Sequence, residues 1–363
     1  MEKILIVRLG AMGDVIHALS AVHALRQSLP QATIDWAIEE KWAELLCAKN
    51  TSRESVRSPQ KPLVDKVRVL DTKRWRKEIV AHKTRQAVAN LRRQLKEENY
   101  DLAIDVQGSA KSAVLTQLSG AKRRFGYESP RESLAKLFYS ETVRNPAECV
   151  HVIQQAEALV REAACLTLPP QKWRAEGGER RGEALPCDVN AEAWVNEMLI
   201  HRGIADGKFA IMNPGAGWGA KQWPAERYGQ VASALAEHGI KTLVNVAPEI
   251  GEKQLAATVE EASKGRAKTI TCSIGELIAL TRRASLFVGG DTGPMHLAAF
   301  LGVPVVALFG PTDPARNGPY YSPHAVLRSE RSVTSYSHGN EADPGLISIG
   351  AQEVIASARK LLS

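Results

Sequence analysis

The chain has 363 residues, which is too long for one ordinary hydrophobic core and suits two domains. Its 44% hydrophobic and 24% charged residues exclude a disordered, a collagen-like and a small disulfide-stapled protein. The net charge of +7 is uneven, because residues 1–175 carry +9 and residues 176–363 carry −2. We therefore expect an acidic partner at the first half of the chain.

The basic excess is concentrated between Lys49 and Lys96, where 15 basic residues accompany 4 acidic ones. Such a run is typical of a solvated helix face. It also suits a docking surface for phosphate, acidic sugar, nucleic acid or anionic lipid, and the run alone does not choose between these roles.

The five cysteines are far apart and form no C-x-x-C pair, which predicts reduced thiols and a cytoplasmic protein. The N-terminus becomes polar too early for a signal peptide, and no run of about 18 apolar residues is present. Any contact with a membrane is therefore expected at its surface.

Strands and helices alternate along the first half of the chain, a pattern typical of a parallel, doubly wound sheet. Short apolar runs predict strands, and apolar residues at helical spacing predict the helices between them. The expected elements are strands at 4–7, 33–38, 67–70 and 102–106, a helix at 15–29 and a long basic helix at roughly 75–98.

The alternation restarts after a polar, glycine-rich stretch, interpreted as a linker at 176–189 between domains at 1–175 and 190–350. The fold class is thus α/β, with two doubly wound Rossmann-like domains facing a cleft and ligands at the carboxyl ends of the strands. The second domain is predicted to contain strands at 209–212, 241–246, 286–289 and 305–309, helices at 190–202, 224–238, 251–263, 274–283 and 294–301, and a last amphipathic helix within 351–363.

The turn after the first strand carries Gly10, Gly13 and Asp14. The glycines allow a tight turn and a close approach of a ligand, and the following helix offers unpaired N–H groups. Asp14 can be the cap of this helix, or a carboxylate kept ionised by the helix end and aimed into the cleft as a general base.

A second turn, NPGAGWGAKQWP at 213–224, places three alternate glycines before a lysine and a proline-started helix. Gly215, Gly217 and Lys221 in this arrangement suit a phosphate cradle. The plainer interpretation is a mobile glycine loop with a surface lysine.

A third turn, GGDTGPMHLAA at 289–299, ends a strand and starts a helix. Thr292 and Gly293 would present N–H groups to an anion, and His296 lies in the same first helical turn. A histidine here can also be purely structural, but the neighbouring glycine-rich loop favours a functional role.

Basic residues are interleaved with tryptophan in KRWRK at 73–77, and Gln107 and Lys111 follow the strand at 102–106. Such residues can bind nucleic acid or a phosphorylated sugar. No Asp-x-Asp pair occurs in the sequence, so we expect no metal cofactor. Diphosphate charge would then be met by Lys221, backbone N–H groups and helix dipoles.

Together these segments resemble the ADP-heptose:lipopolysaccharide heptosyltransferases, glycosyltransferase family 9, which have the GT-B fold. The opening ILIVRLGAMGDVIHALSAV is similar to the N-terminal signature of the family, and GDTGPMHLA at 290–298, followed by FGPTDP at 309–314, is similar to its most specific motifs. KRWRK at 73–77, DVQGSAKSA at 105–113 and KQWP at 221–224 are most like heptosyltransferase I.

The resemblance implies an inverting, metal-independent transfer of heptose from ADP-L-glycero-D-manno-heptose to Kdo2-lipid A in lipopolysaccharide inner-core biosynthesis. It implies that Asp14 is the catalytic base, that Lys221 stabilises the ADP leaving group, and that Asp291 holds the heptose hydroxyls. The resemblance also implies an acidic residue that meets the adenosine ribose, which is Glu249 or, if the alignment is shifted, Glu252. The other donor-binding residues are then Gly215, Gly217, Thr292, Gly293 and His296.

The resemblance also implies a peripheral location at the cytoplasmic face of the inner membrane, and an acceptor site in the first domain. Some heptosyltransferases I carry hydroxyl residues where this chain has Ala216 and Gly217, so hydroxyl contacts to phosphate are not expected there. Two alternatives stay open: another GT-B nucleotide-sugar transferase, heptosyltransferase II-like or with a different donor, and a basic nucleic-acid-binding protein. The acceptor-binding residues are expected to be Gly13, Arg74, Arg76, Gln107, Lys111 and Arg131.

Overall fold

The computed structural model describes residues 2–77, 82–167, 181–204, 207–247, 250–335, 339 and 341–363, without the side chains of Lys73, Arg76 and Lys77. The chain divides into two compact units, Met1–Cys187 and Asp188–Ser363. This division falls inside the predicted linker, of which residues 176–180 lie outside the described residues.

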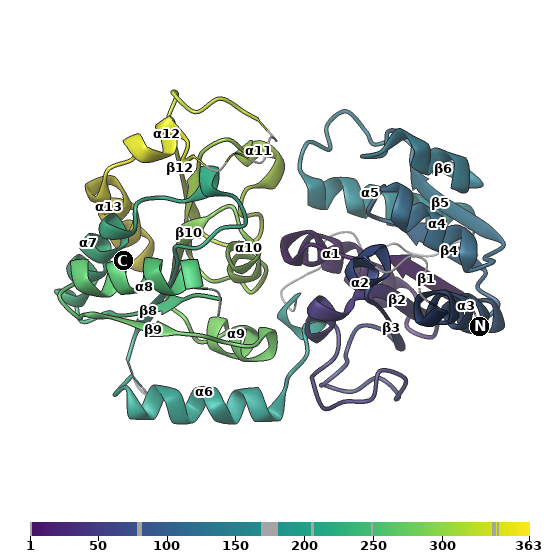
Figure 1. Ribbon diagram of the computed structural model, residues 1–363, viewed down its shortest axis with the longest axis horizontal. Coiled ribbons are helices and arrows are strands. Elements are labelled where there is room, and N and C mark those ends of the chain that lie inside the picture. Colours follow the sequence, from purple (N-terminus) through teal and green to yellow (C-terminus); the bar gives the residue numbers. More distant parts are fainter. Residues whose placement is uncertain are drawn as a thin grey trace. The chain divides into compact units, whose positions relative to one another are not determined.

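The first unit is built on a parallel six-stranded sheet with the order β3-β2-β1-β4-β5-β6 (Figure 1). This is the strand order of a Rossmann fold, in which the order reverses at the first strand. In the register of the sheet, Val7 pairs with Ala37 on one side and with Asp105 on the other, so the turn after Val7 leaves the sheet at its carboxyl edge. The strands are β1 (Lys3–Val7), β2 (Thr33–Glu39), β3 (Lys66–Leu70), β4 (Leu102–Asp105), β5 (Arg123–Tyr127) and β6 (Glu141–Val143).

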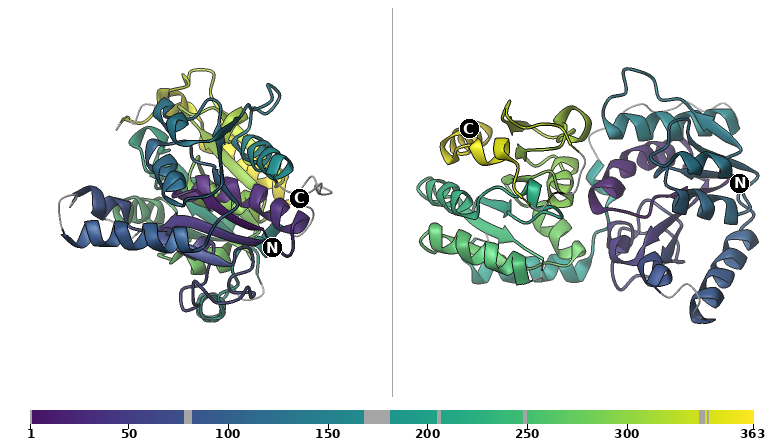
Figure 2. Two further views of the ribbon diagram at one scale, coloured as in Figure 1. Left: turned by 90° about the vertical axis from the view of Figure 1, so that its right-hand side faces the viewer. Right: turned by 45° about the horizontal axis from the view of Figure 1, so that its top comes forward.

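Helices cover both faces of this sheet, as Figure 2 shows in two further views. α1 packs against α5 on one face, while leucines of α3 and α4 join a core with Leu5 and Val7 on the other. The helices are α1 (Met12–Ser28), η1 (Glu40–Leu45), α2 (Thr72–Lys77), α3 (His82–Glu97), α4 (Ala110–Leu118), η2 (Ser133–Phe138), α5 (Val152–Thr167) and η3 (Arg181–Ala184), where η denotes a 3₁₀ helix.

In the first unit, the predicted basic helix at 75–98 is described as α2 up to Lys77 and as α3 from His82, and residues 78–81 between them lie outside the described residues. The sequence pattern does not predict β5 and β6. β5 begins with two arginines and β6 is a three-residue edge strand, so neither has the continuous apolar run that marks a buried parallel strand.

The second unit repeats the same architecture, with a parallel sheet in the order β12-β11-β10-β7-β8-β9. β7 is the first strand of this unit along the chain. β8 and β9 follow on one side of it and β10, β11 and β12 on the other, which is again the Rossmann order. The edge strands β9 and β12 are absent from the sequence expectation because their exposure interrupts the apolar pattern. The strands are β7 (Phe209–Asn213), β8 (Lys241–Asn245), β9 (Ala267–Ile270), β10 (Leu286–Gly290), β11 (Val305–Phe309) and β12 (His324–Arg328).

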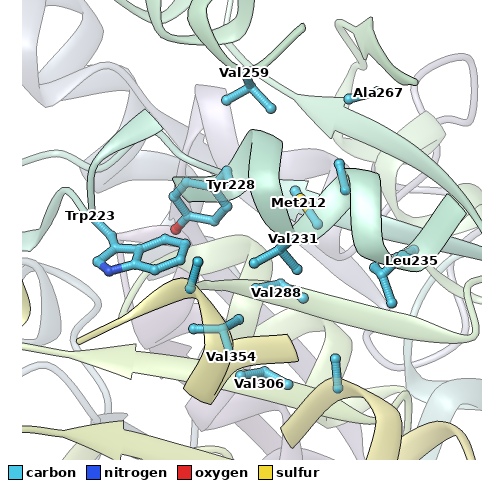
Figure 3. Close-up of a cluster of buried hydrophobic side chains, with 14 of the residues drawn as sticks. Met212, Trp223, Tyr228, Val231, Leu235, Val259, Ala267, Val288, Val306 and Val354 are labelled. Carbon is cyan, nitrogen blue, oxygen red and sulfur yellow. The ribbon is translucent and has the colours of Figure 1, made fainter. Parts of the chain in front are cut away.

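Two hydrophobic clusters fill the second unit, one on each face of its sheet. Figure 3 shows the cluster beneath α7, α8 and α13, in which Trp223, Tyr228 and Val354 lie together. The rings of Trp223 and Tyr228 meet edge to face at 4.9 Å, and Trp223 Nε1 donates to the Ile349 carbonyl at 3.0 Å. The helices are α6 (Val189–His201), η4 (Gly219–Lys221), α7 (Ala225–Ala236), α8 (Ile250–Ala262), α9 (Ile274–Thr281), α10 (Gly293–Phe300), α11 (Pro314–Asn317), α12 (Pro344–Ser348) and α13 (Ala351–Leu362).

The predicted tail helix is therefore α13, and it belongs to the core of the second unit through Val354, Ile355 and Ala358. The five cysteines are all unpaired thiols. Among the described helices, none combines the length and the apolar character that a membrane span requires.

Candidate functional site

A lysine, an aspartate and a histidine meet at the carboxyl edge of the second sheet. Lys221 Nζ lies 2.6 Å from Asp291 Oδ2 and also donates to the backbone oxygen of Asp291 at 3.3 Å. His296 Nε2 lies 3.0 Å from Asp291 Oδ1. Because an ionised carboxylate can only accept, His296 carries a proton on Nε2 and donates it to this bond. Both oxygens of Asp291 are thus held by a donor.

Two opposing effects set the pKa of Asp291. Burial raises this pKa, but the hydrogen bonds and charges of His296 and Lys221 outweigh burial and hold it well below the ordinary value for aspartate. Asp291 is therefore an anion throughout the physiological pH range, able to accept hydrogen bonds from the hydroxyl groups of a ligand.

The start of α10 leaves backbone donors available beside this cluster. Thr292 precedes the helix, but its Oγ1 donates to the Gly290 carbonyl at 3.3 Å and does not cap the helix N-terminus. The first turn of a helix has N–H groups without intrahelical partners, and together with the helix dipole they attract an anion. Gly290 is needed for the approach of the two turns, since a Cβ there would lie 3.0 Å from the Lys221 carbonyl oxygen.

The glycine-rich loop that leads to Lys221 is held in place at both ends. Asn213 Nδ2 donates to the Gly215 carbonyl, and Asn213 Oδ1 accepts from Asn245, each at 2.8 Å. At the other end, Lys221 Nζ lies 4.4 Å from the centre of the Trp218 ring, and the next tryptophan, Trp223, is buried in the core. These contacts connect the loop to β7, β8 and the core and place Lys221 beside Trp218.

Glu252 lies directly against this loop. A Cβ on Gly215 would come within 2.5 to 2.7 Å of the Glu252 carboxylate, whose Oε2 accepts from the Ala247 N–H at 2.6 Å. Glu249, the first candidate for the ribose contact, lies outside the described residues. Glu252, the alternative, is thus the carboxylate that the structure places beside the predicted phosphate cradle.

In the first unit, Asp14 is the third residue of α1, one after Gly13. Its Oδ2 accepts from the Ala11 N–H at 3.1 Å, and its Oδ1 pairs with the Arg8 guanidinium at 2.7 Å. Asp14 therefore helps to start the helix, from the third helical position and not as the cap residue. Its side chain stays 41% exposed, so the carboxylate remains within reach of a ligand.

Gln107 connects the turns that follow β1 and β4. Its Oε1 accepts from the Leu9 N–H at 2.8 Å, and its Nε2 donates to Ser109 Oγ at 3.0 Å. Gly108 has φ of +69°, and a Cβ there would lie 3.2 Å from the backbone nitrogen of Arg131, whose side chain is exposed. Gln107 and Arg131 therefore lie at the same edge of the first sheet as Asp14.

Lys111 is engaged by two groups that the sequence does not indicate. Its Nζ lies 3.0 Å from Glu39 Oε1 and 2.6 Å from Thr72 Oγ1, which begins α2. The short basic helix α2 thus adjoins the start of α4. Arg74 on α2 is exposed, while the side chain of Arg76 lies outside the described residues.

The site residues predicted from the sequence do not include Arg8, Glu39 or Thr72. Arg8 could have been found, because it is a basic residue two positions before the first glycine turn. Glu39 and Thr72 carry no local signal, since they meet Lys111 only because β4 pairs with β1, β1 with β2 and β2 with β3.

The two Rossmann-ordered units and their turn-borne polar groups place the protein in the GT-B class of glycosyltransferases. The structure of Escherichia coli heptosyltransferase WaaC with ADP is similar to the chain, with a TM-score of 0.76, 25% identity and 99% of both chains covered. A glycosyltransferase family 9 structure from Veillonella parvula has a TM-score of 0.79 at 23% identity, with 99% of this chain and 97% of that chain covered, and so shares the fold.

The model of glycosyltransferase family 9 (heptosyltransferase) matches residues 88–342, and the chain belongs to this family. Lipopolysaccharide heptosyltransferase 1 of Escherichia coli K12 is 28% identical, with 91% of this chain and 94% of that protein aligned. The enzyme of the same name from Pseudomonas aeruginosa is also 28% identical, with coverages of 90% and 84%. The predicted family, fold class and glycosyltransferase activity are confirmed, whereas the roles of individual residues stay predictions.

Proposed function

We propose that this glycosyltransferase transfers heptose from ADP-L-glycero-D-manno-heptose to Kdo2-lipid A, with inversion at the anomeric carbon, at the cytoplasmic face of the inner membrane. The observation that carries the proposal is the cluster of Lys221, Asp291 and His296 beside the open N-terminus of α10. Similarity to enzymes named lipopolysaccharide heptosyltransferase 1 over most of the chain supports this donor and acceptor.

The second unit has the groups needed to bind a sugar diphosphate. Lys221 has three N–H donors, of which two already meet Asp291, so the third remains for a phosphate oxygen. The N–H groups of α10 add a second set of donors, which strengthen as charge develops on the leaving ADP. The ionised Asp291 then accepts from the heptose hydroxyls, and Glu252 from the ribose.

The first unit has the group needed to activate the acceptor. In the proposed step, the acceptor oxygen bonds to the anomeric carbon while the bond from that carbon to the ADP oxygen breaks. The acceptor proton passes to Asp14, and ADP leaves with the bonding electron pair. Each oxygen of Asp14 already accepts one hydrogen bond but keeps a lone pair for this proton, and Arg8 orients the carboxylate.

In the proposed mechanism no metal ion takes part, and Lys221 with the backbone N–H groups of α10 stabilises the charge that develops on the leaving ADP. The test is a mass-spectrometric transfer assay with ADP-heptose and Kdo2-lipid A, run with and without EDTA and against UDP- and GDP-sugars. Transfer from ADP-heptose in EDTA is the expected result. No transfer from ADP-heptose would reject the proposed donor, and transfer only to an acceptor that already carries one heptose would indicate a heptosyltransferase II-like enzyme.

A further inference from the structure

The 3₁₀ helix η2 exposes its leucines and buries its alanine. Leu134 and Leu137 are 64% and 77% exposed, whereas Ala135 between them is fully buried. Residues three apart in a 3₁₀ helix lie above one another, so the two leucines form one apolar ridge. Single exposed leucines are common, but two adjacent ones on an ordered element favour a surface that is covered in use.

The ridge is held rigidly at both ends. Glu132, just before η2, donates its N–H to the Gly108 carbonyl at 3.0 Å and accepts from the first N–H of α4 at 2.9 Å. Tyr139, just after η2, donates its hydroxyl to the buried Asp105 at 2.8 Å, and Arg124 Nε donates to the Phe138 carbonyl at 3.1 Å. The leucines therefore point outward because the surrounding framework places them there.

Two exposed cations, Arg131 and Lys136, flank the ridge. Residues 122–144 contain six basic and three acidic residues, but three of the cations are already in ion pairs: Lys122 with Asp101, Arg123 with Glu141 and Arg144 with Glu128. A protruding apolar pair with cationic neighbours fits the interface of an anionic bilayer, where leucines contact acyl chains and cations contact lipid phosphates.

We propose that η2 is the surface by which the first unit docks on an anionic phospholipid membrane. The choice of a lipid occupant rests on the proposed function, in which the acceptor is itself anchored in a bilayer. η2 is joined through Glu132 to Gly108, the residue after Gln107, and Gln107 binds the turn that leads to Asp14. Docking at η2 thus brings the membrane to the unit that is proposed to receive the lipid-anchored acceptor.

The test measures partitioning of the full-length protein onto phosphatidylglycerol/phosphatidylethanolamine vesicles and onto phosphatidylcholine vesicles by sedimentation. The double variant Leu134→Ser/Leu137→Ser is expected to lower partitioning at least about tenfold, because two large apolar side chains are lost from the interface. Lys136→Gln is expected to lower it about fivefold on the anionic vesicles only. The matched control is Val189→Ser/Ile200→Ser on α6, which removes two side chains of similar exposure, 64% and 63%, and leaves partitioning unchanged.

Thermal melting establishes that the variants fold, and turnover is measured on a water-soluble, de-acylated acceptor, which needs no membrane. Unchanged turnover on this acceptor together with lost vesicle binding supports the proposal. The proposal is overturned if the leucine variant binds vesicles as well as the wild type does. It is also overturned if the wild type binds no vesicles, or if the leucines serve only to self-associate. Absence of transfer to any acceptor by the wild type rejects the proposed function, while the vesicle assay still tests η2.

Discussion

The two aspartates assigned to the reaction are held in different ways. Asp291 is buried, with both oxygens bound by donor side chains that keep it ionised. Asp14 is half-exposed, with one backbone donor and one guanidinium. A buried, fully bonded anion suits the anchoring of a ligand, whereas an exposed carboxylate can take up a proton and release it again.

Replacing Asp14 by Asn tests its role as the base. An asparagine oxygen still accepts from the Ala11 N–H, so the start of α1 is kept while the basic group is lost. Turnover is expected to fall at least about 100-fold. ADP affinity measured by calorimetry should stay at the wild-type value, and near-normal turnover would reject Asp14 as the base.

The glycine-rich loop offers a matched pair of substitutions. Gly215→Ala would push a Cβ against the Glu252 carboxylate, which is fixed by the Ala247 N–H, whereas a Cβ on Gly217 meets no atom within 4 Å in the described part of the chain. Displacing Glu252 should weaken ADP binding about tenfold, the effect of losing one hydrogen bond to a charged group. Gly217→Ala leaves Glu252 in place and should therefore bind ADP more tightly than Gly215→Ala. Equal affinities of both variants, measured by calorimetry, would contradict the placement of Glu252 in the donor site.

The lowered pKa of Asp291 predicts how the free energy of unfolding changes in acid. Its pKa is lower in the folded protein than in the unfolded chain, so as the pH falls the unfolded chain takes up the proton first. The stability that Asp291 provides is therefore complete above its unfolded pKa of about 3.9 and is lost as the pH falls below it. Urea unfolding should give a difference between wild type and Asp291→Asn that is constant from about pH 5 to 8 and narrows below about pH 4. A difference that widens in acid would contradict the lowered pKa.

At the scale of elements, the turn after β1 depends on the turn after β4. Arg8 donates to the Val106 carbonyl at 2.8 Å, and the Leu9 N–H donates to Gln107 at 2.8 Å. These bonds fix the path of the chain just before Asp14. Asp14, the proposed base, is thus positioned by a second turn nearly 100 residues away, which reaches it because β1 and β4 are adjacent.

Gln107→Ala removes the acceptor of the Leu9 N–H. The free energy of unfolding is expected to fall by about 1–2 kcal/mol, because that donor loses its partner. Turnover should fall while ADP affinity is unchanged, since the donor groups lie in the other unit. Gln107→Glu retains an accepting oxygen and should keep most of the stability in urea unfolding. If Gln107→Glu loses as much unfolding free energy as Gln107→Ala, loss of the Leu9 contact is not the cause of the destabilisation.

At the scale of the whole molecule, the charge follows the two units. Residues 1–187 contain 31 basic and 23 acidic residues, whereas residues 188–363 contain 16 and 17. The unit proposed to bind the acidic acceptor thus holds the surplus of cations, and the other unit is proposed to bind a diphosphate with a few local groups.

Neutralising α2 tests this division. Arg74→Gln/Arg76→Gln should raise the KM for the acceptor and reduce the dependence of this KM on salt, because two positive charges that attract an anionic acceptor are lost and salt screens such attraction beyond about 8 Å. ADP affinity should stay unchanged. The control, Arg316→Gln/Arg331→Gln, removes two exposed charges from the second unit and should leave the acceptor KM as it was. A change in ADP affinity in the Arg74→Gln/Arg76→Gln variant would contradict the assignment of these arginines to the acceptor.

The family, the alternation of strands and helices and the three polar turns could be predicted from the sequence, because they depend on local signals: glycine at a tight turn, apolar spacing and a proline at a helix start. The edge strands β6, β9 and β12 could not, because their exposure breaks the apolar pattern. The pairs of groups that meet are visible only in the folded chain: Lys221 with Asp291, 70 residues apart, Lys111 with Glu39, and Glu252 with Gly215. Parallel pairing brings the ends of distant strands to one edge, and no local pattern records which side chains meet there.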